Sequence, residues 1–515
     1  MNNGTELLDR LYNLMPVLYR ERDEKVGFPL RDLLRLVTEQ ADIVHSDIQL
    51  LWDNFFIETC QPWAVPYIGD LVSNNLLNDA QNLKAPDTAR ELFDDLIGPD
   101  LRPTNAIRTR ADVAKTIYYR RRKGTLPMLE ELARDVTGWA AHAMEFFELL
   151  IWNQNLNHLR LHSLGCPDLR DPEKVDRLNG PFDFMSHTVD VRFPRQDEGW
   201  YNIRNIGFFL WRLRDYHMEQ VVARPGAQPW QFHFSPLGND TPLFSKFRRE
   251  GNEAALATEL HVPGPIRPGA FFKLRGEFYG TGNSFAIFRD GVLVPEAQIE
   301  CRNLEPWLQP TGNVVGVDVR LGRIAFGTTF VPARGVDVDY HYGFSADLGG
   351  GPYPRAKWLM NHEVVINAQP PGVQFTVREG GVAPDFPTLN AAMNAWVLQG
   401  KPNAVITIVD NRTYALNSPV SLADDRFLVI QAEDRRRPHI KPTGRRLVLT
   451  GNHPGSELSL SGLLIEGAIH VTGEMQRLRL LHTTLVPGRA LKEDGSPATR
   501  RPSITVDDVD AAGNH

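Results

Sequence analysis

The sequence predicts a multidomain α+β protein with an N-terminal helical bundle domain, a central small all-β domain and a C-terminal segment that resembles a parallel β-helix. Three observations lead to this fold class. They are an apolar seam with heptad spacing, short strands bounded by turns, and a repeat of about 20 residues. We place the helical domain at 1–150, an aromatic-rich connecting domain at 151–264, a sandwich or barrel at 265–350, and a capping helix with β-helix rungs at 370–515.

The clearest element is a long helix from Pro29 to Phe55. Proline suits a first helical position, because its missing N–H leaves no helix hydrogen bond unmade there. The apolar residues that recur at alternating steps of four and three are Leu30, Leu34, Val37, Ala41, Val44, Ile48, Leu51 and Phe55. The residues that widen this seam are Leu33, Leu36, Ile43 and Leu50. We interpret the seam as a partner interface in a bundle of three or more helices; a helix packed inside its own domain is the alternative.

Two shorter helices are expected at 105–123 and 126–137, since Gly124 and Gly138 stand where helices would end. Thr125 is the expected N-cap of the second helix. The junction between them consists of Arg121, Arg122, Lys123, Gly124 and Thr125. We interpret its cations as a structural junction that pairs with carboxylates of a neighbouring subunit; a phosphate-binding patch is the alternative.

Strand signals dominate the rest of the chain. Alternating apolar and polar residues predict a strand over 188–193. The run of apolar residues within 201–216 fits either a strand or a helix. Between 265 and 345, short apolar segments lie between Gly, Pro and Asn–Asp turns, which is typical of a small sandwich or barrel.

The last part of the chain begins with a helix at 385–396 and continues with short apolar strands. Two of its segments align at an offset of about 20 residues, which is typical of a solenoid. The aligned pairs are Leu458 with Leu478, Leu460 with Leu480, Ile465 with Leu485, and Gly467 with Pro487. The chain stops about one rung later, so we expect the natural protein to be longer than 515 residues.

Composition excludes several classes of protein. The net charge of −7 is spread over both signs, which argues against a general nucleic-acid binder. The N-terminus lacks the pattern of a signal peptide, and no apolar run is long enough for a membrane helix, so we expect no membrane insertion. Cys60, Cys166 and Cys301 are too scattered for a zinc ribbon or a disulfide framework, and fit buried thiols in a reducing cytoplasm.

No catalytic, cofactor or metal site is predicted. His158 and His162 could share a helix face, but the glutamate of a metalloprotease is missing between them. A β-helix hydrolase would need paired carboxylates, yet one rung on from Glu466 stands Val486. We therefore expect a protein that is not an enzyme and carries no cofactor.

Two motifs resemble the phage tail protein I family: WDNFFIETCQPWAVPYIGDLV at 52–72 and IYYRRRKGTLPMLEELARDVTG at 117–138. In that family an apolar helix, a Cys–Pro–Trp-like turn and an RRKGT helix junction occur in the same order. The block YNIRNIGFFLWRLRDY at 201–216, the segments GRIAFGTTF and VDYHYGFSADLGGGPY, and the repetitive tail are similar to wedge proteins of contractile injection systems. The tail departs from the short phage versions of the family, which lack it.

The resemblance implies a structural role in a phage-tail-like baseplate. The implied partners are two copies of a baseplate-J-like wedge protein and the neighbouring wedges of a sixfold ring, with the tail hub, sheath-adaptor and fibre proteins as further candidates. The implied place of assembly is the bacterial cytoplasm, within a particle that is released or anchored at a membrane. The alternative function is a peripheral tailspike or a carbohydrate-binding protein with a β-helix.

Overall fold

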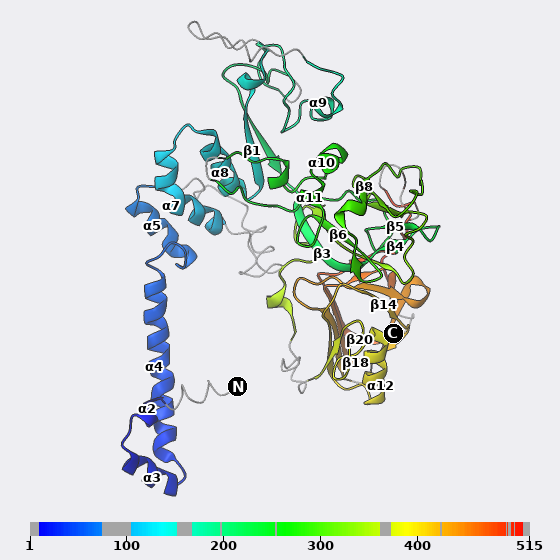
Figure 1. Cartoon of the computed structure of the whole chain (residues 1–515). Helices are drawn as coiled ribbons and strands as arrows, with labels where there is room; N and C mark the ends of the chain where they lie inside the picture. Colours follow the sequence, from blue (N-terminus) through cyan, green and yellow to red (C-terminus); the bar gives the residue numbers. More distant parts are fainter. Residues whose placement is uncertain are drawn as a thin grey trace. The chain divides into compact units, whose positions relative to one another are not determined.

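Helices come first along the chain and β-sheets follow, in the computed structural model of this α+β protein (Figure 1). The structure describes residues 10–74, 105–151, 167–195, 198–252, 255–360, 372–422, 425–490, 492, 496–498 and 500–507. The chain divides into two compact units, Met1–Ala143 and Met144–His515. Within the described ranges, no helix is long and apolar enough to cross a membrane.

The predicted long helix is present as α4, Pro29–Asp53, and the short helices α2 (Arg10–Asn13) and α3 (Val17–Lys25) contact it. Its first turn depends on the buried Asp23. The carboxylate of Asp23 accepts the N–H groups of Leu30 at 2.7 Å and of Arg31 at 3.1 Å. Because first-turn amides have no acceptor within the helix, this carboxylate stabilises the helix start.

The helix was expected to reach Phe55 but ends at Asp53. The Thr59 hydroxyl donates to the Asp53 carbonyl at 2.8 Å, and the Asn54 side chain accepts the amide of Gln61 at 2.7 Å. These bonds turn the chain away from the helix axis, so Phe55 follows the helix instead of continuing its face.

The remaining helices of the first unit are η1 (Pro62–Ala64), α5 (Val65–Leu71), α7 (Asn105–Arg121) and α8 (Leu126–Thr137). The predicted helix pair is therefore present. Gly124 and Gly138 both have positive φ, at 89° and 70°. Thr125 occupies the N-cap position, but its hydroxyl donates to the Arg122 carbonyl at 2.9 Å and accepts no helix N–H. The prediction of Thr125 as the N-cap residue is therefore confirmed, and the tight turn at Gly124 brings the Arg122 carbonyl within reach of its hydroxyl.

The central part of the second unit contains a five-stranded sheet in the order β4–β5–β10–β9–β8 and a four-stranded sheet in the order β3–β11–β6–β7. Both sheets contribute to one apolar core, which includes Phe285, Val317 and Ile324. The elements are β1 (Ala140–Glu145), η3 (Phe146–Leu149), α9 (Pro172–Asp176), β2 (Ile206–Trp211), β3 (Arg214–Val222), β4 (Arg224–Pro225), β5 (Gln231–His233), η5 (Glu259–His261), α10 (Pro268–Lys273), α11 (Arg275–Phe278), β6 (Phe285–Arg289), β7 (Val292–Leu293), η6 (Glu296–Gln298), β8 (Ile299–Cys301), β9 (Val315–Asp318), β10 (Arg323–Phe326), β11 (Val336–Phe344) and η7 (Ala356–Trp358).

The segment expected as a connecting domain supplies strands to these same sheets. Arg323 of β10 pairs with His233 of β5, and Tyr342 of β11 pairs with Tyr216 of β3. The ambiguous block at 201–216 is thus extended, in β2 and the start of β3. The segment after 265 also holds two short helices, α10 and α11, because Pro268 starts a turn that buries Phe271.

No strand forms over 188–193, contrary to the prediction. The side chain of Asp190 accepts the N–H groups of Arg192 at 3.1 Å and of Gly199 at 2.9 Å, and so folds the segment into a loop. Short polar side chains that bind nearby backbone amides compete with strand pairing, and here the alternating apolar residues stay exposed.

The C-terminal part contains two sheets in which the recorded pairings are parallel, and from β16 to β22 successive strands alternate between them. One sheet contains β12 (Val373–Val377), β13 (Ala404–Ile408), β15 (Val420–Ser421), β16 (Phe427–Ala432), β18 (Arg446–Ser461), β20 (Ala468–Leu481) and β22 (Ile504–Val506). The other contains β14 (Thr413–Leu416), β17 (His439–Pro442), β19 (Leu464–Ile465) and β21 (Thr484–Leu485), and the short η8 (Thr443–Arg445) follows β17. Helix α12 (Leu389–Leu398) buries Trp396 against the apolar interior.

The predicted repeat register is confirmed over part of these strands. Leu458 pairs with Leu478, and Leu460 with Leu480, while Ile465 pairs with Leu485 in the second sheet. The register shifts between His453 and Glu457, so the first halves of β18 and β20 pair at a longer spacing. Extra residues in β18 between His453 and Glu457 shift the spacing without disturbing the buried apolar residues, which explains why only one offset was visible in the sequence.

Candidate functional site

The apolar seam on α4 lies on a helix with little support from the rest of its unit. Every side chain from Gln40 to Trp52 is exposed, and Val44 and Ile48 are each 58% exposed. Burial is concentrated in the first turns, where α2 and α3 contact the helix: Leu30 and Leu34 are half-buried and Thr38 is buried. Isolated helices are marginally stable in water, and an exposed apolar stripe adds an unfavourable hydration free energy. This part of α4 has the properties of a surface that a partner covers.

The predicted junction residues lie together between α7 and α8. The Arg122 guanidinium stacks 4.5 Å from the ring centroid of Tyr118. Arg121 and Lys123 are exposed, and in the described part of the chain neither has an ion-pair partner. Their charges are therefore accessible to a neighbouring subunit.

The junction is braced by contacts that the motifs did not reveal. Arg120 donates to the carbonyls of Val72 at 3.0 Å and Ser73 at 2.6 Å, which ties α7 to the segment after α5. Lys115 on α7 bridges Asp135 and Glu131 on α8. The two resembling motifs thus form one packed unit.

A fully buried carboxylate lies on α8. Glu130 accepts Arg134 Nη2 at 2.6 Å and the amide of Ala143 at 3.0 Å, and lies 3.2 Å from His142 Nδ1. The sequence analysis did not single out this group. Its position one turn before an arginine was the available signal, since such pairs share a helix face.

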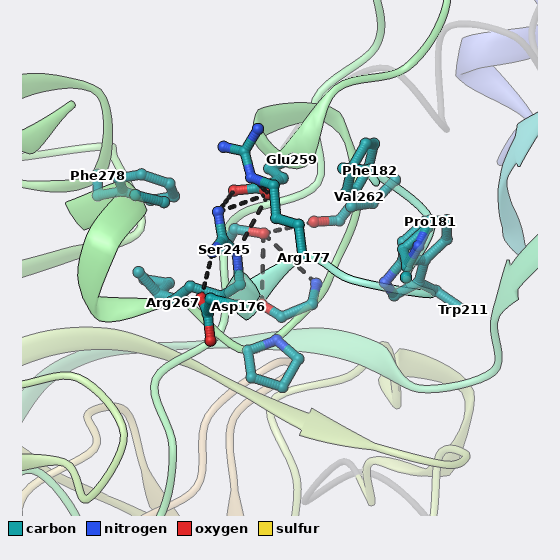
Figure 2. Close-up of a pocket in the computed structure, with 15 residues that line it drawn as sticks. Asp176, Arg177, Pro181, Phe182, Trp211, Ser245, Glu259, Val262, Arg267 and Phe278 are labelled. Carbon is teal, nitrogen blue, oxygen red and sulfur yellow. Dashed lines mark hydrogen bonds and ion pairs between the residues drawn. The ribbon is translucent and has the colours of Figure 1, made fainter. Parts of the chain in front are cut away.

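The second unit contains a pocket of about 150 Å³ (Figure 2). The rings of Phe182 and Trp211 form part of its wall, with centroids 5.7 Å apart. Ser245 also lines it, and its hydroxyl donates to the Val262 carbonyl. The interior is therefore largely apolar, and charged groups gather at one side.

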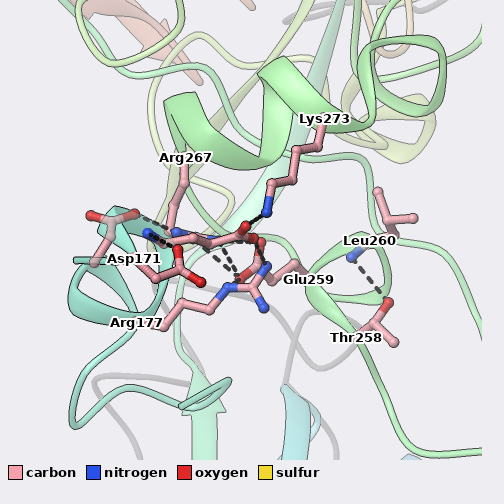
Figure 3. A network of polar contacts seen from close by, with 9 residues as sticks. Asp171, Arg177, Thr258, Glu259, Leu260, Arg267 and Lys273 are labelled. Atoms are coloured by element: carbon pink, nitrogen blue, oxygen red, sulfur yellow. Dashed lines mark hydrogen bonds and ion pairs between the residues drawn. The ribbon is translucent and has the colours of Figure 1, made fainter. Parts of the chain in front are cut away.

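These charged groups form a closed network (Figure 3). Arg177 contacts Glu173 at 2.7 Å and Glu259 at 3.0 Å, and Arg267 contacts Glu259 at 2.8 Å. Arg267 also pairs with Asp176 and, at 4.0 Å, with Glu173, and Lys273 pairs with Glu173. Three carboxylates and three cations alternate, which joins the loop around α9 to the segment 259–273.

The ion pairs of this network have the arrangement of a structural clamp. Burial alone would lower the pKa of Arg267, but its hydrogen bonds to Glu259 and Asp176 raise that pKa. Each carboxylate of the network forms an ion pair with at least one of the three cations. Across the described ranges, no group of three or more His, Cys, Asp and Glu side chains is placed to hold a metal ion; His158, His162 and Cys166 lie outside those ranges.

Comparison with known protein families, with curated proteins and with solved structures finds no match to this chain. The resemblance to the tail protein I family stays a prediction that rests on the two motifs.

Replacement of Arg267 by methionine should destabilise the second unit by about 2 kcal/mol, because Glu259 and Asp176 would lose their shared cation. Urea denaturation followed by circular dichroism measures this change. The matched control is Arg320→Met: Arg320 is 61% exposed and pairs with the exposed Glu305, so its stability effect should lie within error. Equal effects of the two replacements would contradict the clamp.

Proposed function

We propose that this chain is a structural wedge subunit in the baseplate of a contractile injection system, where α4 joins two baseplate-J-like subunits in a helical bundle. The observation that carries the proposal is the exposure of the whole stretch from Gln40 to Trp52. The alternative of a helix packed inside its own domain finds no support in the described part of the first unit. In the proposed role the chain catalyses no reaction.

The width of the apolar stripe supports a bundle with more than one partner helix. Val37, Val44 and Ile48 lie on one side of α4, and the exposed Leu36, Ile43 and Leu50 extend the surface around the helix. A two-stranded coiled coil would cover only the narrower a/d seam. Two partner helices would bury the full width.

We further propose that the C-terminal part is a β-helix with α12 as its cap. The parallel pairings and the alternation of strands between two sheets support this fold. Trp396 of α12 packs on the apolar interior near β12 and β13, as a cap on the first rung would.

Polar contacts between the central sheets and the proposed β-helix suit a part that transmits force. Arg436 contacts Glu219 at 2.8 Å, and Asn411 donates to the carbonyl of Glu219 at 2.8 Å. Arg412 pairs with Asp337. Such bonds resist sliding of the proposed β-helix against the central sheets. Movement at a neighbouring wedge would therefore displace both parts of the second unit together.

Co-expression with the host's baseplate-J-like protein tests the proposal. We expect purification through a tag on this chain to yield a complex with two partner copies, as measured by light-scattering mass. Deletion of residues 30–55 should abolish it. A soluble monomer or homotrimer from the intact chain would overturn the wedge assignment and favour a peripheral tailspike or carbohydrate-binding protein. Intact complex from the deleted chain would overturn the role of α4.

A further inference from the structure

A single buried carboxylate in the second unit lies close to several basic side chains. Glu466 follows β19 and is 4% exposed. Its oxygens lie 3.1 Å from Arg489 Nε, 3.4 Å from Arg224 Nη1 and 3.8 Å from Arg445 Nε. His439 Nε2 lies at 3.3 Å. One negative charge is thus shared by three guanidinium groups and an imidazole.

Positive charge exceeds negative charge around Glu466. Burial lowers the pKa of Lys441, and the nearby Arg224 lowers that pKa further. Burial also lowers the pKa of Arg489. The charge of Glu466 raises this pKa, whereas the charges of Arg224 and Arg445 lower it further. Among the described residues, Glu466 is the one carboxylate that offsets these cations. The local potential therefore favours an additional anion.

A cavity of about 370 Å³ opens beside this cluster. Three arginines, Arg445, Arg489 and Arg501, line it together with other residues of 237–239 and 487–490. Arg489 is held in place by a hydrogen bond from Nη1 to the Leu237 carbonyl at 3.3 Å. Arg501 is exposed and has no ion-pair partner within the described ranges, so its donors are free for a ligand.

We propose that this arginine pocket binds the carboxylate or phosphate group of a small organic anion. Guanidinium groups present paired N–H donors that match the oxygens of both groups. The cavity lies within the usual size range of ligand pockets, and is too large for a bare inorganic ion to fill. The site is independent of α4 and of the assembly role proposed above.

Isothermal titration calorimetry on the full chain tests this site with four probes: inorganic phosphate, glucuronate, glucose 1-phosphate and neutral glucose. We expect at least one organic anion to bind more tightly than inorganic phosphate, and glucose not to bind. A preference for glucuronate would identify the anionic group as a carboxylate, and a preference for glucose 1-phosphate would identify it as a phosphate.

The variant Arg501→Gln should weaken binding of the preferred probe by about tenfold or more, since a charge-assisted bond to the ligand is lost. Its thermal unfolding should not change, because Arg501 makes no described contact that the fold needs. Arg500→Gln removes the same charge from the adjacent exposed residue, which does not line the cavity, and should leave affinity unchanged.

Three outcomes would overturn the proposal. They are the absence of binding by either organic anion, equal affinity for inorganic phosphate and the organic anions, and equal loss of affinity in the two arginine variants. The last outcome would show a general charge effect in place of a site.

Discussion

Replacement of both Val44 and Ile48 by glutamate should abolish association with the proposed baseplate-J-like partner. Burial of two such side chains contributes about 3–6 kcal/mol, so the loss corresponds to more than about a hundredfold in Kd. Glutamate would also place unpaired charges in the bundle interior. Co-purification and light-scattering mass measure the effect.

The free chain should tolerate this double replacement. Val44 and Ile48 are exposed in the chain by itself, and glutamate is a good helix former, so circular dichroism should show unchanged helix content. The matched control is Ser46→Glu with Gln49→Glu, which adds the same charge to the opposite face of α4. Wild-type assembly by the Val44 and Ile48 variant, or equal loss in the control, would contradict the proposed bundle.

Replacement of Glu466 by glutamine should destabilise the second unit by about 3–5 kcal/mol, because buried cations would lose their counter-charge. Glu474→Gln is the control: Glu474 is exposed on β20, and its loss should have no measurable effect. Urea denaturation of the full chain measures both variants. Equal stability of the Glu466 variant and the wild type would show that the cations do not need this carboxylate.

The contribution of Glu466 should depend on pH. Burial raises the pKa of Glu466, but the hydrogen bond from His439 and the charges of Arg489 and Arg224 outweigh it and lower the pKa to about 2. A carboxylate with a lowered folded pKa stabilises the fold fully above its unfolded pKa, near 4.5. The stability difference between wild type and variant should therefore shrink as the pH falls from about 4.5 toward 2. A constant difference across this range would contradict the linkage.

Features with a short repeat could be predicted from the sequence. The seam on α4 was visible because every residue of a helix advances by the same angle, and Pro29 marked its start. Leu458 and Leu478 could be aligned because parallel rungs place equivalent apolar residues inside. Gly124 showed where α7 gives way to α8, since a positive φ favours glycine.

The two charge clusters of the second unit could not be predicted in this way. Arg267 and Asp176 are 91 positions apart, and Arg224 and Glu466 are 242 apart. Before folding, each is an ordinary charged residue with no spacing that relates it to its partner. The strands β3 to β5 likewise join sheets with segments far along the chain, which local alternation does not encode.

The sequence by itself determined where backbone geometry repeats: the long helix, its apolar stripe, the glycine-bounded helix pair and the register of the last parallel strands. Those features follow from interactions between residues a few positions apart or one rung apart. Only the tertiary structure decided which charges meet. Ion pairs form wherever folding brings opposite charges together, so the clamp at Glu259 and the arginine pocket beside Glu466 depend on contacts that no local pattern records.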